Sequence, residues 1–259
     1  MVLYNTIGAG YNTTRNADPY ITNRIFEMLE PRTDGVYLDI GCGTGNYLKA
    51  LTEKGLNFYG IDPSEVMLNE ARKSCDNAIL IQGTSENIPL PGRFFDGAIA
   101  ILTTHHWSDL QKGLKELNRV LKPGARAVFF TFSPEQMMGY WLHHYFPKMI
   151  ENSRLVAPPV SDMIAYIGKS GFVNIIQEKY FIRKDLQDHF LYSNKHNPAM
   201  YLLPEIRMGA SAFRNFTTPE ELEKGLAQLA TVINSGDINN VMKKYENDMG
   251  DYLFLAATK

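Results

Sequence analysis

A glycine-rich turn directly after a short apolar segment constrains this chain more than any other feature. Residues 36–40 read Val-Tyr-Leu-Asp-Ile, a pattern typical of a buried strand, and Gly41, Gly43 and Gly45 follow. Glycine enters the left-handed backbone region without strain and, lacking Cβ, lets another group approach the backbone closely. A strand, such a turn and a following helix place free backbone N–H groups at the carboxyl edge of a parallel sheet, where open α/β folds bind ligands. Asp39 adds a carboxylate that suits a cation.

The spacing of the glycines distinguishes between two kinds of ligand. A dinucleotide-binding turn has the pattern G-x-G-x-x-G, in which the third glycine packs the helix onto the sheet and the helix N-terminus faces a pyrophosphate. Here the pattern is G-x-G-x-G, and Asn46 occupies the position of the last dinucleotide glycine. The spacing therefore disfavours a nicotinamide dinucleotide.

Residues 39–45, Asp-Ile-Gly-Cys-Gly-Thr-Gly, resemble the first motif of the class I S-adenosylmethionine-dependent methyltransferases, and specifically of their small-molecule branch. The resemblance implies a Rossmann-like α/β fold with a helical cap. Its seven-stranded sheet would have the order 3-2-1-4-5-7-6, with strand 7 antiparallel. The resemblance also implies S-adenosyl-L-methionine as the cofactor, with contacts from Asp39, Gly41, Cys42 and Gly43.

The next expected strand, residues 57–62, ends in Asp62. A carboxylate about 20 residues past the glycines can accept hydrogen bonds from both ribose hydroxyls of a nucleotide. Pro63 then opens a helix, since proline is tolerated in a first helical turn. By resemblance Met67 packs on the adenine ring, although a helical methionine is by default core filler. Asp62, Pro63 and Met67 therefore join the expected cofactor site.

Residues 83–90 follow a short expected strand at 78–82 and resemble the family's G-D-A-E-x-L-P-F segment, which cups the adenine edge. Thr84 and Ser85 replace the usual aspartate and alanine, whereas Glu86 is retained. Adenine N6 would then meet a hydroxyl or a backbone carbonyl in place of a carboxylate. Such an exchange would lower the nucleotide affinity.

Residues 94–101 predict a fourth strand covered on both faces, because the segment carries too few charges for an exposed sheet. Residues 102–107, Leu-Thr-Thr-His-His-Trp, match the family's strand-end segment, and Leu102 and Thr103 are assigned to the cofactor site. Residues 108–111 predict a capping box for the next helix. That helix is expected to stop at Lys-Pro-Gly, residues 122–124, within a match to the family's R-V-L-K-P-G, before a fifth strand at 125–132.

Histidine pairs at the end of the fourth strand and in the following aromatic segment raise the question of a catalytic base. His105 and His106 are the candidates for base catalysis or for shaping the substrate site, and His143 and His144 are further candidates for a base. The sulfonium already activates the methyl group, so alignment of the acceptor supplies most of the rate and a base is optional. Adjacent histidines on a helix point about 100° apart, and no carboxylate cluster supports them, so we expect no metal.

Two further segments are expected near the methyl group. Residues 10–15 resemble the family's Y-x-x-x-R arm, in which Arg15 faces the methionyl carboxylate and Tyr11 shields the methyl group. The alternative is a surface arm with a solvated arginine. Aromatic residues of the expected cap, above all Tyr140, Trp141 and Tyr145, are candidates for the walls of an apolar substrate pocket, although some of them belong to the core.

Composition limits the partners and the compartment. The 259 residues are 44% hydrophobic and carry a net charge of −2, without a basic footprint for nucleic acid or a polybasic run for membranes. Cys42 and Cys75 are the only cysteines, which suggests neither a disulfide framework nor a zinc site. No signal core or apolar stretch of ~20 residues occurs. These features predict a cytoplasmic protein.

We expect one methyltransferase domain over residues 1–259. Its parts are an N-terminal arm and helix at 1–34, a cofactor-binding core at 35–132, cap insertions at about 133–170 and 185–246, and a last strand at 251–258. An irregular helix is expected at 135–149 and a sixth strand at 172–183. The predicted function is methyl transfer to a small, partly apolar metabolite. Alternatives are a non-catalytic protein that binds the cofactor or its product, methylation of a macromolecule and, more remotely, a nicotinamide-dependent oxidoreductase.

Overall fold

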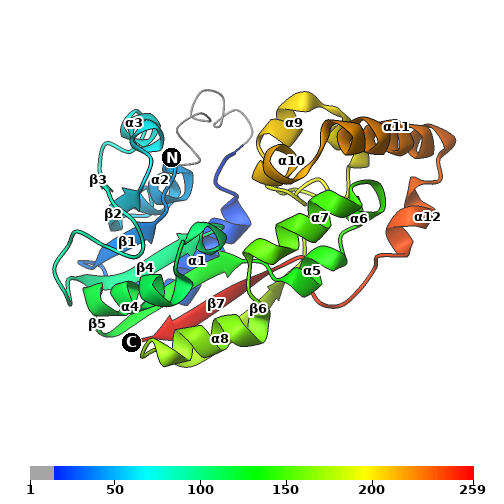
Figure 1. Ribbon diagram of the computed structural model, residues 1–259. Helices are drawn as coiled ribbons and strands as arrows, with labels where there is room; N and C mark the ends of the chain where they lie inside the picture. The colour runs from blue at the N-terminus through cyan, green and yellow to red at the C-terminus, as the bar shows by residue number, and fades with distance from the viewer. Residues whose placement is uncertain (1–14) are drawn as a thin grey trace.

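The computed structural model describes residues 15–259, which form a seven-stranded sheet flanked by helices, with a helical cap at one end (Figure 1). The strand order is β3-β2-β1-β4-β5-β7-β6. Strand β7 pairs antiparallel with β5 and β6, while the other pairings are parallel. This confirms the predicted order. The strands are β1 Val36–Ile40, β2 Asn57–Asp62, β3 Ile79–Gln82, β4 Phe95–Ile101, β5 Leu121–Thr131, β6 Val173–Tyr180 and β7 Tyr252–Thr258.

Alternating side chains of the central strands build two separate cores. On one face of the sheet, Tyr37 of β1 packs in a cluster with Phe58 of β2 and Phe130 of β5; its neighbour Leu38 belongs to the cluster on the other face. The first cluster is covered by α1 (Pro19–Leu29), α2 (Asn46–Thr52) and α3 (Glu65–Arg72), and the second by α4 (Leu110–Val120) and α8 (Val160–Lys169). Because successive strand residues point to opposite faces, such strands are buried on both sides.

Side-chain caps fix where several of these helices begin. Asp18 accepts a hydrogen bond from the backbone N–H of Ile21 at 3.0 Å and so begins α1. Ser64 caps α3, so Pro63 lies one residue before the cap and not inside the first turn. The predicted capping box at 108–111 is also corrected, since Asp109 caps α4 while the hydroxyl of Ser108 donates to Glu86 instead.

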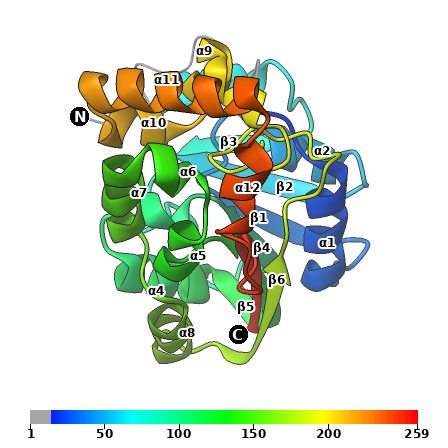
Figure 2. The same ribbon diagram turned by 90° about the vertical axis from the view of Figure 1, so that its right-hand side faces the viewer.

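The cap is built from α11 and several short helices that follow β5 and β6 and gather beyond one end of the sheet (Figures 1 and 2). In place of the single irregular helix expected at 135–149, the chain forms three short helices, because Gly139 ends the first and Pro147 begins the third. The cap elements are α5 Pro134–Met138, α6 Leu142–Tyr145, α7 Pro147–Ser153, η4 Arg154–Val156, η5 Pro198–Leu202, α9 Pro204–Met208, α10 Ser211–Phe216, α11 Pro219–Ser235 and α12 Ile238–Lys243.

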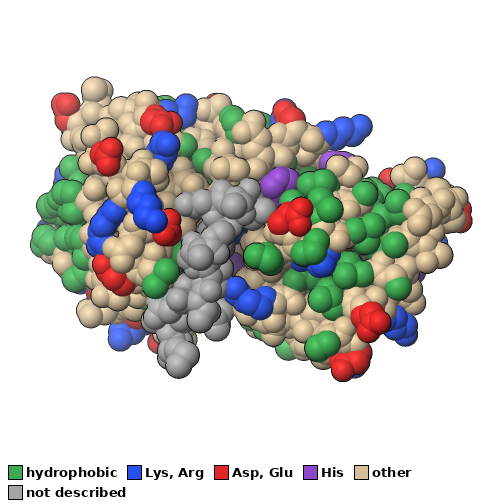
Figure 3. Space-filling model, turned by 90° about the horizontal axis from the view of Figure 1, so that it is seen from above, with side chains coloured by type: hydrophobic (Ala, Val, Ile, Leu, Met, Phe, Trp, Pro, Cys, Tyr) green, Lys and Arg blue, Asp and Glu red, His purple; other side chains and the backbone are tan. Residues whose placement is uncertain are grey.

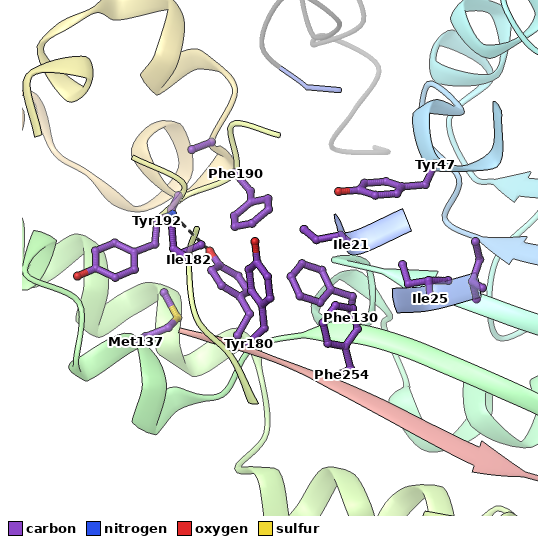
Figure 4. Packing of buried hydrophobic residues seen from close by; sticks show 14 of the residues in the cluster. Ile21, Ile25, Tyr47, Phe130, Met137, Tyr180, Ile182, Phe190, Tyr192 and Phe254 are labelled. Atoms are coloured by element: carbon purple, nitrogen blue, oxygen red, sulfur yellow. Dashed lines mark hydrogen bonds between the residues drawn. The ribbon is translucent and has the colours of Figure 1, made fainter. Parts of the chain in front are cut away.

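Aromatic side chains join the cap to the sheet (Figure 4). The ring of Phe130 lies 4.7 Å from that of Phe254 and 5.4 Å from that of Tyr180, measured between centroids. Phe190, from the segment after β6, packs 4.6 Å from Tyr252 at the start of β7. Edge and offset ring contacts of this kind add to the stabilisation from burial. They hold the segment after β6 against the carboxyl edge of the sheet. Across residues 15–259, the helices are too short or too polar to cross a membrane.

Candidate functional site

The glycine-rich turn between β1 and α2 adopts the left-handed backbone that its sequence requires. The φ angles of Gly41, Gly43 and Gly45 are 70°, 54° and 80°. The N–H groups of Gly41 and Cys42 both donate to the carbonyl of Ile61 at 2.8 and 3.0 Å, which ties the turn to the end of β2. A side chain with a Cβ is strained at such angles, so the sequence fixes this turn locally.

Gly43 leaves space that a ligand can use. A Cβ atom placed on it would meet no protein atom closer than the methyl carbon of Met67, at 3.8 Å. Both residues line a cavity of about 610 Å³ at the carboxyl edge of the sheet. A methyl group at position 43 would therefore occupy the cavity and not the protein interior. This is the close backbone approach for which glycine is suited.

Asp62 is held in place by two backbone hydrogen bonds. Its Oδ2 accepts from the N–H of Gly43 at 3.0 Å, and its Oδ1 accepts from the N–H of Ser64 at 2.8 Å. Burial raises the pKa of the Asp62 carboxyl, while these two hydrogen bonds act in the opposite direction. The carboxylate is thus oriented at the cavity wall before any ligand arrives.

Asp39 is buried at the same wall, and no cationic side chain of residues 15–259 forms an ion pair with it. Burial, and then the neighbouring Asp62 carboxylate, raise the pKa of Asp39 to about 8. An opposite charge close to a carboxyl group reverses such a shift. A ligand with a cationic group near Asp39 would therefore be favoured.

The large cavity brings together most of the residues that the sequence assigned to the cofactor and to chemistry. These are Arg15, Asp39, Gly41, Cys42, Gly43, Asp62, Pro63, Met67, Thr84, Ser85, Glu86, Leu102, Thr103, His105 and His106. They come from positions as distant as the segment before α1 and the end of β4. Tyr11 lies outside the described residues.

The far end of the cavity is shaped by the segment after β3 and by Trp107. Glu86 accepts hydrogen bonds from the hydroxyl of Ser108 at 3.0 Å and from the N–H of Asp109 at 3.1 Å. Burial acts to raise the pKa of Glu86, but hydrogen bonds to the carboxylate lower it by more. The pKa of Glu86 therefore lies below its ordinary value. A Cβ on Gly113 would lie 2.5 Å from the Trp107 ring, so glycine in α4 lets the indole pack against the helix.

Arg15 is fixed by groups from two distant parts of the chain. The side-chain amide of Asn46 donates to its carbonyl at 2.8 Å, and its guanidinium pairs with Asp188 with an Nε–Oδ1 distance of 2.5 Å. Asp188 also accepts from the hydroxyl of Tyr47 at 3.1 Å. Burial, and then the Asp188 charge, raise the pKa of Tyr47 well above its ordinary value, so this hydroxyl remains a donor.

Sequence reasoning did not assign Asn46, Tyr47 or Asp188 to the site, although all three line the cavity. Asn46 carried a usable signal, because it occupies the position where a dinucleotide fold has glycine. Tyr47 follows it at the start of α2. Asp188 carried no local signal.

His105 and His106 lie in the short helix η3 (Thr104–His106) directly after β4, where Leu102 adopts a left-handed φ of 48°. Their ring centroids are 3.8 Å apart. Burial lowers the pKa of His105 well below its ordinary value. His106 is exposed as a residue, yet desolvation of its imidazole by the surrounding protein, and then the charge of Arg15, lower its pKa to about 4. Both imidazoles are therefore neutral at pH 7 and weaker bases than an ordinary histidine.

A smaller cavity of about 80 Å³ adjoins the large one. The two share Arg15, Leu102, His105 and His106 in their walls. The remaining wall of the smaller cavity is largely apolar and comes from the ends of β5 and β7 and from the cap. The site thus has a polar compartment at the glycine-rich turn and an apolar compartment under the cap.

Tyr140, Trp141 and Tyr145, which were expected to wall the substrate pocket, are buried in the cap and line neither cavity. The hydroxyl of Tyr140 donates to the carbonyl of Asp251 at 2.5 Å, and the indole N–H of Trp141 donates to the carbonyl of Lys195 at 3.0 Å. These bonds hold the side chains inside the cap. The aromatic residues that line the smaller cavity are instead Phe132, Phe190, Phe216 and Tyr252.

Within residues 15–259, no group of three or more His, Cys, Asp and Glu side chains is placed to hold a metal ion. The polar groups at the larger cavity are instead the carboxyl groups of Asp39, Asp62, Glu86 and Asp188, a turn with open backbone space and further hydrogen-bonding side chains. This donor set suits an organic ligand with a cationic group and hydroxyls. A volume of about 610 Å³ lies within the usual range for cofactor sites.

Residues 38–129 match the methyltransferase domain family. A solved structure from Anabaena variabilis, described as a "putative methyltransferase from antibiotic biosynthesis pathway", is 31% identical in sequence. Their alignment covers 95% of this chain and 99% of that chain with a TM-score of 0.85.

More distant comparisons also find methyltransferases. An uncharacterized methyltransferase of Mycobacterium tuberculosis is 28% identical over 135 residues, which are 52% of this chain and 55% of the relative. The chain thus spans about half the length of the curated relatives it matches. A phosphoethanolamine N-methyltransferase from Haemonchus contortus, solved with S-adenosyl-L-methionine, is 19% identical and has a TM-score of 0.56. That alignment covers 93% of this chain and 52% of that chain, and at this identity it shows the fold alone.

Proposed function

Because the chain belongs to the class I S-adenosylmethionine-dependent methyltransferases, we propose that it methylates a small, partly apolar metabolite. The observation that carries this proposal is the junction of the two cavities at His105 and His106. The larger cavity matches the cofactor in size and in chemistry. The smaller one, beneath the cap, is the place for the acceptor.

The residues of the larger cavity fit S-adenosyl-L-methionine. Asp39 offers a buried carboxyl group to the methionyl ammonium, and Asp62 is oriented to accept hydrogen bonds from the ribose hydroxyls. Gly43 leaves its backbone open to the ligand. When bound, the cofactor supplies a methyl group on a sulfonium, and a lone pair of the acceptor takes that methyl while the carbon–sulfur electron pair stays on sulfur.

The protein's own contribution at the junction is to align the acceptor and to shape its site. Walls from two cavities hold the acceptor atom beside the cofactor site, and proximity of this kind supplies much of the rate. The imidazoles of His105 and His106 are neutral at pH 7, so their unprotonated ring nitrogens are available to accept a hydrogen bond from the acceptor and to shape its site.

The size of the smaller cavity favours a small acceptor over a macromolecule. Its volume of about 80 Å³ is smaller than the roughly 150 Å³ of an engineered apolar cavity that binds benzene. A nucleic-acid base is larger than benzene and would also have to pass beneath the cap. A compact apolar group fits this space best.

The cap segments, residues 133–170 and 185–246, act as a lid in this proposal. Val156 of η4 and Phe216 of α10 line both cavities, so the acceptor enters by displacing cap elements. Lid motions of this kind occur on a μs–ms scale. Amide exchange with S-adenosylhomocysteine should slow in these segments. Slowing confined to residues 39–86 would identify the cap as a static element.

Methyl transfer itself is tested with S-adenosylmethionine carrying a tritiated methyl group and a cell extract separated by molecular size. The proposal predicts label in the small-molecule fraction. It also predicts that the Asp62→Ala variant transfers much less label. Label confined to nucleic acid or protein would establish macromolecular methylation, whereas binding of the cofactor without any transfer would favour a non-catalytic binding protein.

A further inference from the structure

The smaller cavity contains no acidic side chain among the described residues that line it. Arg15 and Arg214 are the described lining residues with a charged side chain, since the two imidazoles are neutral. Arg15 is already paired with Asp188, which largely cancels its charge. The remaining charge at this wall is therefore the positive charge of Arg214.

Arg214 lies on α10 at the exposed side of the cavity. Its Nε donates to the side chain of Asn215 at 3.3 Å, and no carboxylate of residues 15–259 forms an ion pair with it. A guanidinium has five N–H donors, and a carboxylate or phosphate matches its geometry best. Arg214 thus keeps donors available to a ligand that reaches the cavity.

The interior of the cavity suits an apolar body. Much of its wall is apolar and comes from Phe132, Phe190, Phe216 and Met137. On the outer surface, the view from above also shows apolar side chains gathered over the cap (Figure 3). Two buried polar atoms of its lining residues have no hydrogen-bond partner in the described part of the chain: Oγ of Ser153 and Nδ1 of His105. Both belong to neutral groups, so neither compensates a cation.

We infer that the acceptor is a small anionic molecule with a short apolar body, whose carboxylate or similar group binds Arg214 while its reactive atom reaches His105 and His106. This inference rests on the proposed function and names its substrate class. A protonated amine, with an ordinary pKa of about 10, would bring a second cation beside Arg214 without a carboxylate to pair with it. Like charges placed together in this way suppress a wrong ligand.

Three short probes that share a three-carbon chain and differ in charge test the inference: propanoate, propan-1-ol and propan-1-amine. Each is titrated by calorimetry into the full chain saturated with S-adenosylhomocysteine. We expect the carboxylate to bind at least tenfold more tightly than the amine, with the alcohol between them. Arg214→Gln should reduce this preference to less than threefold. The matched control Arg32→Gln, an exposed arginine absent from both cavity walls, should leave it unchanged.

Affinity for S-adenosylhomocysteine is measured first for each variant. This separates a failure of the proposed methyltransferase function from a failure of the proposed anionic acceptor. Failure of the wild-type chain to bind S-adenosylhomocysteine would overturn the proposed function. If S-adenosylhomocysteine binds normally, three results would overturn the anionic acceptor alone. These are an amine that binds as tightly as the carboxylate, a carboxylate that does not bind, and a preference for the carboxylate that survives in Arg214→Gln. Because Arg214 is exposed, its substitution should leave Tm unchanged.

Discussion

Arg15 and Asp188 lie 173 residues apart in the sequence, yet their side chains form a two-pronged ion pair at the wall of the cofactor cavity. The second contact, from Nη2 to Oδ2, measures 3.2 Å. Through Tyr47, the same carboxylate also contacts the helix that follows the glycine-rich turn. One acidic side chain thus joins the segment before α1, the first motif and the insertion after β6.

Asp188→Ala should lower the free energy of unfolding by roughly 3 kcal/mol, because it leaves the largely buried Arg15 charge without its partner. Asp188→Asn should lose less, since the amide oxygen still accepts from Tyr47. Chemical denaturation measures both. The control is Asp185→Ala, which removes an exposed carboxylate of the same insertion and should change little. Equal effects at 185 and 188 would contradict a structural role for this pair.

Gly43→Ala and Gly55→Ala separate backbone strain from ligand exclusion. Both residues have a left-handed φ, 54° and 87°, so each substitution should cost about 1 kcal/mol of stability. Only Gly43 lines the cavity, whereas a Cβ on Gly55 has no atom within 4 Å. Calorimetry should show at least a tenfold loss of S-adenosylhomocysteine affinity for Gly43→Ala alone. A similar loss in both variants would indicate a general loosening of the fold.

Asp62→Ala should weaken S-adenosylhomocysteine binding more than Thr84→Ala. Hydrogen bonds to a carboxylate contribute about 1.5–3 kcal/mol each, against about 1 for neutral ones. Thr84 pairs with Asn87 through its backbone, which the substitution leaves intact. Titration of the two variants decides the order. Equal losses would mean that the ribose is held by other groups.

Binding should release a proton from Asp39. The pKa of this carboxyl in the free protein is raised to about 8, so at pH 6.5 the group is mostly protonated. A methionyl ammonium favours the ionised form, so the affinity for S-adenosylhomocysteine should rise with pH between 6 and 8. Calorimetry in two buffers of different ionisation enthalpy counts the released proton. Asp39→Asn should abolish this release, and its persistence in that variant would assign the proton to another group.

The parts of the fold that sequence predicts well are those that depend on local backbone requirements. The alternation of Tyr37 and Leu38 between two cores, and the left-handed glycines of the turn, follow directly from residue type and order. The position of these glycines directly after β1 also indicates that the ligand site lies at the carboxyl edge of the sheet.

The contacts that sequence did not predict depend on distant partners. Asp188 acquires its place from Arg15 and Tyr47, and no pattern in residues 185–197 indicates this. Tyr140 and Trp141 resemble pocket residues in composition, but carbonyl groups of distant segments bind their polar atoms and hold them inside the cap. Similarly, Asp109 displaced Ser108 as a helix cap because Glu86 binds the Ser108 hydroxyl. Such competition between partners appears only in three dimensions.

A crystal structure with bound S-adenosylhomocysteine tests the central claim most directly, because the claim is that cofactor and acceptor meet where the two cavities join. The account predicts that the ribose contacts Asp62 and that the sulfur faces the wall formed by His105 and His106, toward the smaller cavity. A ligand whose sulfur faces away from these histidines, or whose ribose lies away from Asp62, would contradict it.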